Sequence, residues 1–226
     1  MQNKYIKQST KLLSALELPI KDEIKRGNSD FNHEVFNVMH LTECPRRMMY
    51  RVNNCKVESK FENKNILVDF HSKFCKIKWL GIFSNSKGIK VLDKNILAAD
   101  SEYNIVGKVD AIISCKGYVS ALMIESIDES SYNIAIKNGG LRQQIVALMT
   151  SMWLTEVKNG VLLCENKNTN DYFLSHVIVS DAIINGVKSK CSKLMENKTL
   201  QQLPLRPYKT NDCEECKCCE YNDKCW

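Results

Sequence analysis

Five of the eleven cysteines in this 226-residue chain lie within its last fourteen residues. They are Cys213, Cys216, Cys218, Cys219 and Cys225. Cysteines two residues apart can turn both sulfurs to the same side, and four thiolates complete either a tetrahedral zinc site or an iron–sulfur cluster. The spacing therefore predicts a metal centre. It does not separate the two metals, because Cys213, Cys216, Cys219 and Cys225 can supply four ligands to zinc.

A second motif supplies one more cysteine. Residues 41–50 read Leu-Thr-Glu-Cys-Pro-Arg-Arg-Met-Met-Tyr, so Cys44 is followed by two arginines and a tyrosine. Together with the Cys-x2-Cys-x-Tyr-x3-Cys tail at 216–225, this motif resembles the iron–sulfur nucleases of the RecB-like PD-(D/E)XK superfamily. Within that superfamily, the motif resembles the CRISPR-associated Cas-four exonucleases, their phage counterparts and the AddB cluster domain. The resemblance implies that Cys44, Cys216, Cys219 and Cys225 hold a structural [4Fe-4S] cluster joining the two ends of the chain, with Cys213 and Cys218 as spares.

The same resemblance implies a site for Mg²⁺ or Mn²⁺, in which acidic side chains at the ends of two neighbouring strands hold the ion. His71 stands where the family has a metal-binding histidine, although a helical histidine is more often an ordinary residue. Gly107-Lys108-Val109-Asp110 matches the family's Gly-x-x-Asp, with Asp110 as metal ligand. Gln144 (or Gln143) matches the family's helical glutamine, and a solvated helix face explains either equally well.

The family's Glu-x-Lys motif is broken. In one alignment of residues 121–128, Glu125 is the metal-binding acid and Ile127 stands where the lysine belongs. In the other, Met123 replaces the acid and Glu125 replaces the lysine. The second alignment is slightly favoured, because Glu129 to Tyr132 then fall in register. Loss of a positioned catalytic group costs about two to four orders of magnitude in rate. Lys108 and Lys137 are candidates to replace the lysine.

Contacts with DNA are expected from three arginines. Arg46 and Arg47 follow Cys44, and Arg142 precedes the two glutamines. Guanidinium groups bind phosphate through paired hydrogen bonds, although such residues are also common as ordinary surface charges. The net charge of +6 permits nucleic-acid binding without demanding it. With no base-reading motif, little sequence specificity is expected.

Apolar spacing and turn residues predict an α/β fold in which a mixed central sheet is flanked by helices. The resemblance identifies this as a PD-(D/E)XK restriction-endonuclease-like core whose N- and C-terminal segments meet at the cluster. The expected helices are 2–17, 34–52 (with a kink or a new start at Pro45), 66–80, 141–158 and 181–197. The expected strands are 88–92, 104–114, 118–125, 160–165 and 172–179. The predicted segments are an N-terminal helix and loop (1–33), a cluster-ligand helix (34–64), the nuclease-like core (65–200) and the cysteine segment (201–226).

No stretch of about 18 apolar residues is present, and the first residues do not resemble a secretory signal. A cytoplasmic location (that of the host, for a viral protein) is therefore expected, where thiols stay reduced and available to metals. Three interpretations remain open. The chain is a metal-dependent exonuclease acting on DNA ends or single strands, a catalytically degenerate relative that binds DNA or scaffolds a partner complex, or an unrelated zinc protein. A protein partner in a recombination, replication or CRISPR-type complex is compatible with the first two.

Overall fold

The structure, a computed structural model, describes residues 34–55, 57 and 59–226 and, in the helix that begins at Ser59, the side chains from His71 onward. The predicted helix 2–17 and loop 20–33 lie outside this range. The described elements are β1 (Phe36–Asn37), η1 (Val38–His40), α2 (Pro45–Val52), α3 (Ser59–Asn85), β2 (Ile89–Asp100), β3 (Ile105–Cys115), β4 (Tyr118–Ile127), α4 (Glu129–Asn138), α5 (Arg142–Leu154), β5 (Asn159–Asn166), β6 (Tyr172–Ile178), α6 (Asp181–Thr199), α7 (Glu214–Lys217) and α8 (Asn222–Cys225).

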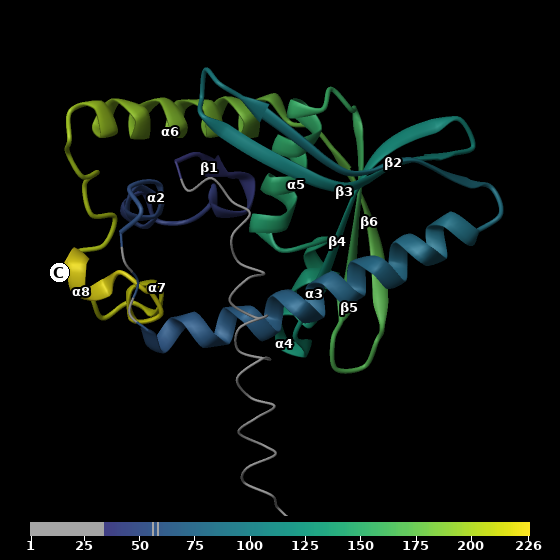
Figure 1. Cartoon of the computed structure of the whole chain (residues 1–226), viewed down its shortest axis with the longest axis horizontal. Coiled ribbons are helices and arrows are strands. Elements are labelled where there is room, and N and C mark those ends of the chain that lie inside the picture. Colours follow the sequence, from purple (N-terminus) through teal and green to yellow (C-terminus); the bar gives the residue numbers. More distant parts are fainter. Residues whose placement is uncertain (1–33, 56, 58) are drawn as a thin grey trace, which may run out of the picture.

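The centre of the molecule is a six-stranded mixed sheet (Figure 1). Its order is β1-β3-β4-β5-β6, and β2 pairs with β3. The β1–β3 and β4–β5 pairs are parallel, and the other pairs are antiparallel. The mixed sheet flanked by helices confirms the predicted fold class. No helix in the described part of the chain is both long and apolar enough to cross a membrane.

Each face of the sheet carries its own apolar core. On one face, α3 packs Cys75, Trp79 and Phe83 against Ala111, Ile124 and other strand residues. These three positions follow the four-residue spacing that returns to one side of a helix. On the other face, α5 buries Leu148 and Met152 with Val109 and Leu162, and α6 adds Val187 and Cys191. Helices α3 and α5 therefore pack on opposite faces of the sheet.

Several sequence predictions need correction. The chain before Pro45 is not α-helical: Phe36–Asn37 form β1 and Val38–His40 form a short 3-10 helix. The α-helix starts afresh at Pro45, whose missing N–H suits a first helical position. The helix predicted to begin at Ile66 begins at Ser59, and its predicted apolar residues Phe74 and Ile77 are 69% and 68% exposed. Burial of Cys75, Trp79 and Phe83 decides which side of α3 faces the sheet.

Two further elements differ from the prediction. Strand β2 continues to Asp100, well beyond the predicted end at Leu92, across a register shift between Val91 and Asp93. Helix α4 was not predicted, although Asp128 caps it by accepting a hydrogen bond from the Ser131 N–H at 3.0 Å. Its exposed Ile134 and Ile136 obscure the apolar periodicity. The predicted helices 141–158 and 181–197 are confirmed to within a few residues.

Candidate active site

Asp110 lies where strands β3 and β4 part. The ladder between these strands runs from Cys115–Tyr118 to Ala111–Leu122 and stops there. Beyond it, Asp110 Oδ2 accepts a hydrogen bond from the Ile124 N–H at 2.7 Å, so the carboxylate replaces the strand as the partner of that amide. Asp110 is only 3% exposed. Where the two strands part, an acidic group is therefore held within the sheet, and an unpaired charge there is costly.

Glu125, on β4, interacts electrostatically with Asp110. Burial raises the pKa of Glu125 to about 7; the charge of Lys76 acts in the opposite direction, and that of Asp110 raises the pKa further. Two carboxylates of which one retains a proton near neutral pH form a site that favours a cation. The structure therefore brings together two of the three metal ligands expected from the sequence.

The positive charge beside these acids comes from α3. Lys76 Nζ lies 2.9 Å from Asp110 Oδ1, and its side chain is 31% exposed. Burial lowers the pKa of Lys76, but the charges of Asp110 and Glu125 outweigh that effect and leave the pKa raised. Nothing in the sequence pairs Lys76 with Asp110, 34 positions away, because only the packing of α3 on the sheet joins them. By contrast, Lys108 and Lys137 are exposed.

His71 is also on α3, but it contacts a different strand residue. Its Nδ1 lies 3.1 Å from Ser126 Oγ, next to Glu125 in sequence. Within the described part of the chain, no three His, Cys, Asp or Glu side chains already converge closely enough to hold a metal ion. The predicted set of His71, Asp110 and Glu125 is thus assembled in part, and the role of His71 as a ligand stays a prediction.

Gln144 lies behind the acidic pair on the α5 face. Its Oε1 accepts a hydrogen bond from the Leu141 N–H at 3.0 Å, which caps the helix, and Cys164 Sγ donates to the same oxygen at 3.5 Å. Cys164 is paired in register with Glu125 and interacts with it electrostatically. Gln144 Nε2 is buried and has no protein partner. Gln143 is exposed, so the structure favours Gln144 as the inward-facing glutamine.

Gly107 has a packing role that explains its place in the motif. A Cβ there would meet Leu154 Cδ1 and Ser151 Oγ at 2.9 Å. The missing side chain lets α5 lie directly on β3, three residues before Asp110. The glycine of the Gly-x-x-Asp sequence therefore helps position the helix behind the site.

A second acidic residue contacts α3 from the sheet. Glu165, on β5, is buried and accepts a hydrogen bond from Trp79 Nε1 at 2.5 Å, and Lys78 forms an ion pair with it. Both partners come from the same turn of α3 that carries Lys76. This pair shows how firmly α3 is tied to the strand ends.

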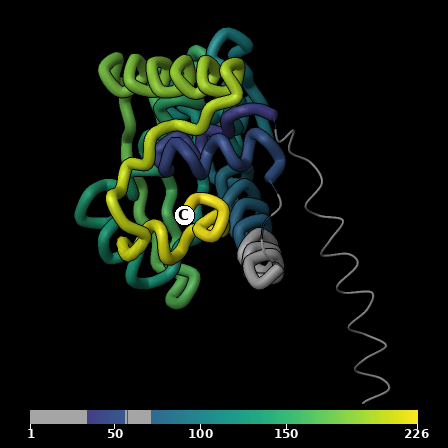
Figure 2. Tube along the Cα trace, turned by 90° about the vertical axis from the view of Figure 1, so that its left-hand side faces the viewer, coloured from purple at the N-terminus to yellow at the C-terminus, as the bar shows by residue number. Residues whose placement is uncertain are grey.

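The predicted DNA-contacting arginines of α2 are engaged inside the protein. Arg46 Nε donates to the Pro204 carbonyl at 2.7 Å, and Arg47 Nη2 lies 2.5 Å from Glu220 Oε2. Arg51 Nη2 binds the other oxygen of Glu220 at 2.6 Å. These contacts tie α2 to the C-terminal segment, which runs beside it in both views (Figures 1 and 2). DNA contact by Arg46 and Arg47 stays a prediction.

Cysteines of both ends lie near this junction, although no three of them in the described part of the chain converge closely enough to hold a metal ion. Cys44 caps α2, and its electrostatic interaction with Cys219 places the two in proximity. Tyr208 interacts in the same way with Cys44, Cys213 and Cys216. Burial, followed by a hydrogen bond with Cys213, raises the pKa of Cys216 to about 11. Cys213 is therefore not remote from the predicted ligands, whereas Cys218 is exposed.

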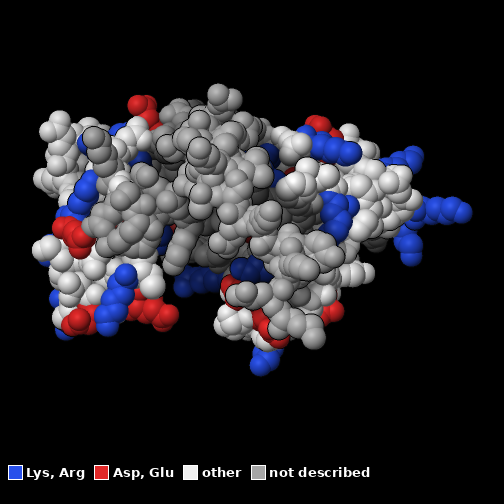
Figure 3. All heavy atoms as spheres, turned by 60° about the horizontal axis from the view of Figure 1, so that its bottom comes forward, with Lys and Arg blue, Asp and Glu red and all other residues white. Residues whose placement is uncertain are grey.

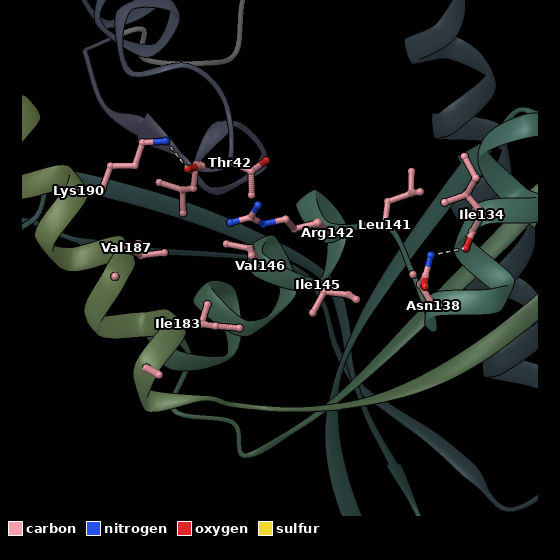
Figure 4. A pocket seen from close by; sticks show the side chains of 14 residues that line it. Thr42, Ile134, Asn138, Leu141, Arg142, Ile145, Val146, Ile183, Val187 and Lys190 are labelled. Atoms are coloured by element: carbon pink, nitrogen blue, oxygen red, sulfur yellow. Dashed lines mark hydrogen bonds between the residues drawn. The ribbon is translucent and has the colours of Figure 1, made fainter. Parts of the chain in front are cut away.

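Arg142 lies elsewhere, at the rim of a pocket of about 780 Å³ between α4, α5, α6 and residues 41–42. Figure 4 shows its side chain extending toward Thr42 on the side of the pocket where Lys190 lies. Lys190 Nζ donates to the Leu41 and Glu43 carbonyls at 2.8 and 2.6 Å. Asp110 and Glu125 do not line this pocket, so Arg142 is not part of the acidic site.

Charge on the face below the sheet is mixed. Figure 3 shows basic side chains gathered toward one end of this face and acidic and basic side chains alternating at the other. The described surface in that view is not a continuous basic stripe.

The fold is shared with solved nucleases. The structure superposes on the alkaline exonuclease LHK-Exo from Laribacter hongkongensis with a TM-score of 0.55 and 10% identity, over 75% of this chain and 90% of that one. The two proteins share a fold. The same enzyme in complex with dAMP gives a TM-score of 0.54 at 11% identity. The protein SSO0001 gives 0.57 at 17% identity and covers 93% of this chain and 95% of its own. No protein-family model and no curated protein sequence matches the chain.

Proposed function

We propose that this protein is a divalent-metal-dependent DNA nuclease that acts on ends or single strands with little sequence specificity. The observation that carries the proposal is the acidic pair of buried Asp110 and partly exposed Glu125, where β3 and β4 part, in a nuclease fold. The donor set suits the ion, because hard divalent cations prefer carboxylate oxygens. One of the structurally similar exonucleases is described in complex with dAMP, which supports a nucleic-acid substrate.

In this proposal Asp110 and Glu125 would hold Mg²⁺ or Mn²⁺. The ion supplies Lewis-acid polarisation of the phosphate and a more acidic water. The protein contributes the rigid placement of the two carboxylates: the Ile124 N–H fixes Asp110, and the strand pairing of β4 with β5 fixes Glu125. Gln144 Nε2, buried without a protein partner, is a donor available behind Glu125.

We further propose that Cys44, Cys216, Cys219 and Cys225 hold a structural [4Fe-4S] cluster. Support comes from the gathering of these cysteines where α2 meets the C-terminal segment, and from the reach of Cys44 to Cys219. The competing arrangement is zinc bound by the tail alone, with Cys213 in place of Cys44. The proximity of Cys213 to Cys216 supports this alternative.

A catalytically degenerate DNA-binding protein is the second candidate function. The observation in its favour is Ile127, which packs against the apolar core on β4 where a lysine is expected. A cleavage assay separates the two candidates.

The decisive experiment is degradation of end-labelled single- and double-stranded DNA by anaerobically prepared protein with Mg²⁺ or Mn²⁺. Wild-type protein should degrade DNA, and Asp110→Asn should lose at least about a hundredfold in rate, because one metal-binding oxygen is removed with little change of shape. Asp93→Asn, an exposed aspartate on β2, is the matched control and should cleave normally. DNA binding without any cleavage by correctly folded wild-type protein would establish the degenerate alternative.

A further inference from the structure

Strand β4 offers no cation to the acidic pair. Glu125 and Ile127 are two residues apart and therefore share a face of the strand. Ile127 packs against the apolar core on the α5 side of the sheet. A charge that stabilises the reacting phosphate must therefore come from another element.

Helix α3 carries such a charge to the site. Cys75, Trp79 and Phe83 anchor the helix on the sheet, so Lys76 is held next to the anchored Cys75. Its ammonium lies 2.9 Å from Asp110 Oδ1 and within electrostatic reach of Glu125. Its side chain is 31% exposed, so part of Lys76 is in contact with solvent beside the acids.

The position of Lys76 is fixed rather than incidental. One turn of α3 makes three contacts with acidic residues of the sheet. Lys76 contacts Asp110, and both Lys78 and Trp79 contact Glu165. Asp110 is itself fixed by the Ile124 amide. Among the described lysines, Lys76 is the one that forms an ion pair with Asp110, whereas Lys108 and Lys137 are exposed on β3 and α4.

We propose that Lys76 replaces the missing strand lysine: its ammonium, delivered from α3, binds the phosphate oxygen beside the Asp110–Glu125 pair and stabilises the negative charge that develops there during hydrolysis. This inference rests on the proposed nuclease function. Lys76 stays protonated throughout and donates hydrogen bonds, so it takes no part in bond making or breaking. A positioned cation of this kind contributes about two to three orders of magnitude in rate.

The test compares single-turnover cleavage by wild type, Lys76→Ala and Lys76→Arg with the matched control Lys90→Ala, which removes an exposed lysine from β2. A double variant, Lys76→Ala with Ile127→Lys, returns a lysine to the strand. We expect Lys76→Ala to lose about a hundredfold or more in rate, Lys76→Arg to retain part of the rate, Lys90→Ala to remain within about threefold, and the double variant to recover at least about tenfold.

Two readouts do not depend on cleavage. Mn²⁺ binding by protein that retains its cysteine-bound metal should be unchanged or slightly tighter in Lys76→Ala, because the ammonium that competes with Mn²⁺ is removed. Binding of a phosphorothioate DNA in Ca²⁺ should weaken by about three- to tenfold, because a charged contact to phosphate is lost. Circular dichroism and melting establish that each variant is folded.

The outcomes separate this inference from the proposed function. Cleavage by wild type that is unchanged or faster in Lys76→Ala would overturn the role of Lys76 and leave the nuclease standing; tighter Mn²⁺ binding in that case would make Lys76 a placeholder for the ion. A slow double variant with weakened Mn²⁺ binding would assign Lys76 to shaping the metal site and also overturn the inference. No cleavage by folded wild type would reject both proposals together.

Discussion

Asp110 and Glu125 are two carboxylates with different surroundings, and the charge of Asp110 affects the pKa of Glu125. Asp110 accepts a hydrogen bond from the Ile124 amide and forms an ion pair with the Lys76 ammonium. Glu125 has the Asp110 charge nearby and is buried, which favours its protonated form. Glu125 therefore gains its negative charge near neutral pH, and a divalent cation should compete directly with the proton on Glu125.

The pH dependence of Glu125 gives a prediction for the metal-free protein. Its folded pKa of about 7 exceeds the ordinary value of 4.5, so between these values the folded state binds more protons than the unfolded state. Stability should therefore fall as pH rises through this window. Thermal melting from pH 5 to pH 8 should show a smaller fall for Glu125→Gln than for wild type, and Mn²⁺ should raise the wild-type melting temperature more at pH 8 than at pH 5. Identical pH profiles for the two proteins would contradict the assignment.

At the scale of elements, the sequence predicts what local patterns determine. Helix α5 was expected because Leu148 and Met152 recur at helical spacing. Asp110 was expected to be a metal ligand because Gly107 to Asp110 match the Gly-x-x-Asp motif of the resemblance. The buried side of α3 and the short strand β1 were not predicted, since both depend on contacts with strands distant in sequence. Lys76 was missed for the same reason. Tertiary packing, rather than spacing, joins it to Asp110.

The contact between α2 and the C-terminal segment gives a prediction at this scale. Glu220 binds both Arg47 and Arg51, and all three side chains are largely buried. Glu220→Ala would leave two guanidinium groups without that partner and should destabilise the protein by about 2–4 kcal/mol. Urea unfolding measures the loss. Glu214→Ala, which removes an exposed acid from α7, is the matched control and should change stability by less than about 0.5 kcal/mol. Equal effects of the two changes would show that Glu220 does not stabilise the junction.

The whole molecule is organised so that its far ends meet. Residues 46–51, which follow β1 and precede the other five strands, contact residues 204–225 through Arg46, Tyr50 and the Glu220 pairs. Strands β2 to β6 lie between these two segments in sequence, while the junction lies to one side of the sheet in space (Figure 1). A covalent or metal link there would close a loop of more than a hundred residues, which is the kind of link that most restricts the unfolded chain.

Removal of the proposed cluster should therefore weaken both ends together. By the loop-closure estimate a link of this length contributes about 5 kcal/mol, and about 2–4 °C of melting temperature accompanies each kcal/mol in a chain of this size. Cys44→Ser should thus lower the melting temperature by about 10–20 °C, abolish the brown colour and iron content, and increase hydrogen exchange in α2 and residues 204–225 at the same time. Cys218→Ser, at the exposed cysteine, should leave all three unchanged. A colourless protein that contains zinc and is unaffected by Cys44→Ser would instead place the metal in the tail alone, with Cys213 as the fourth ligand.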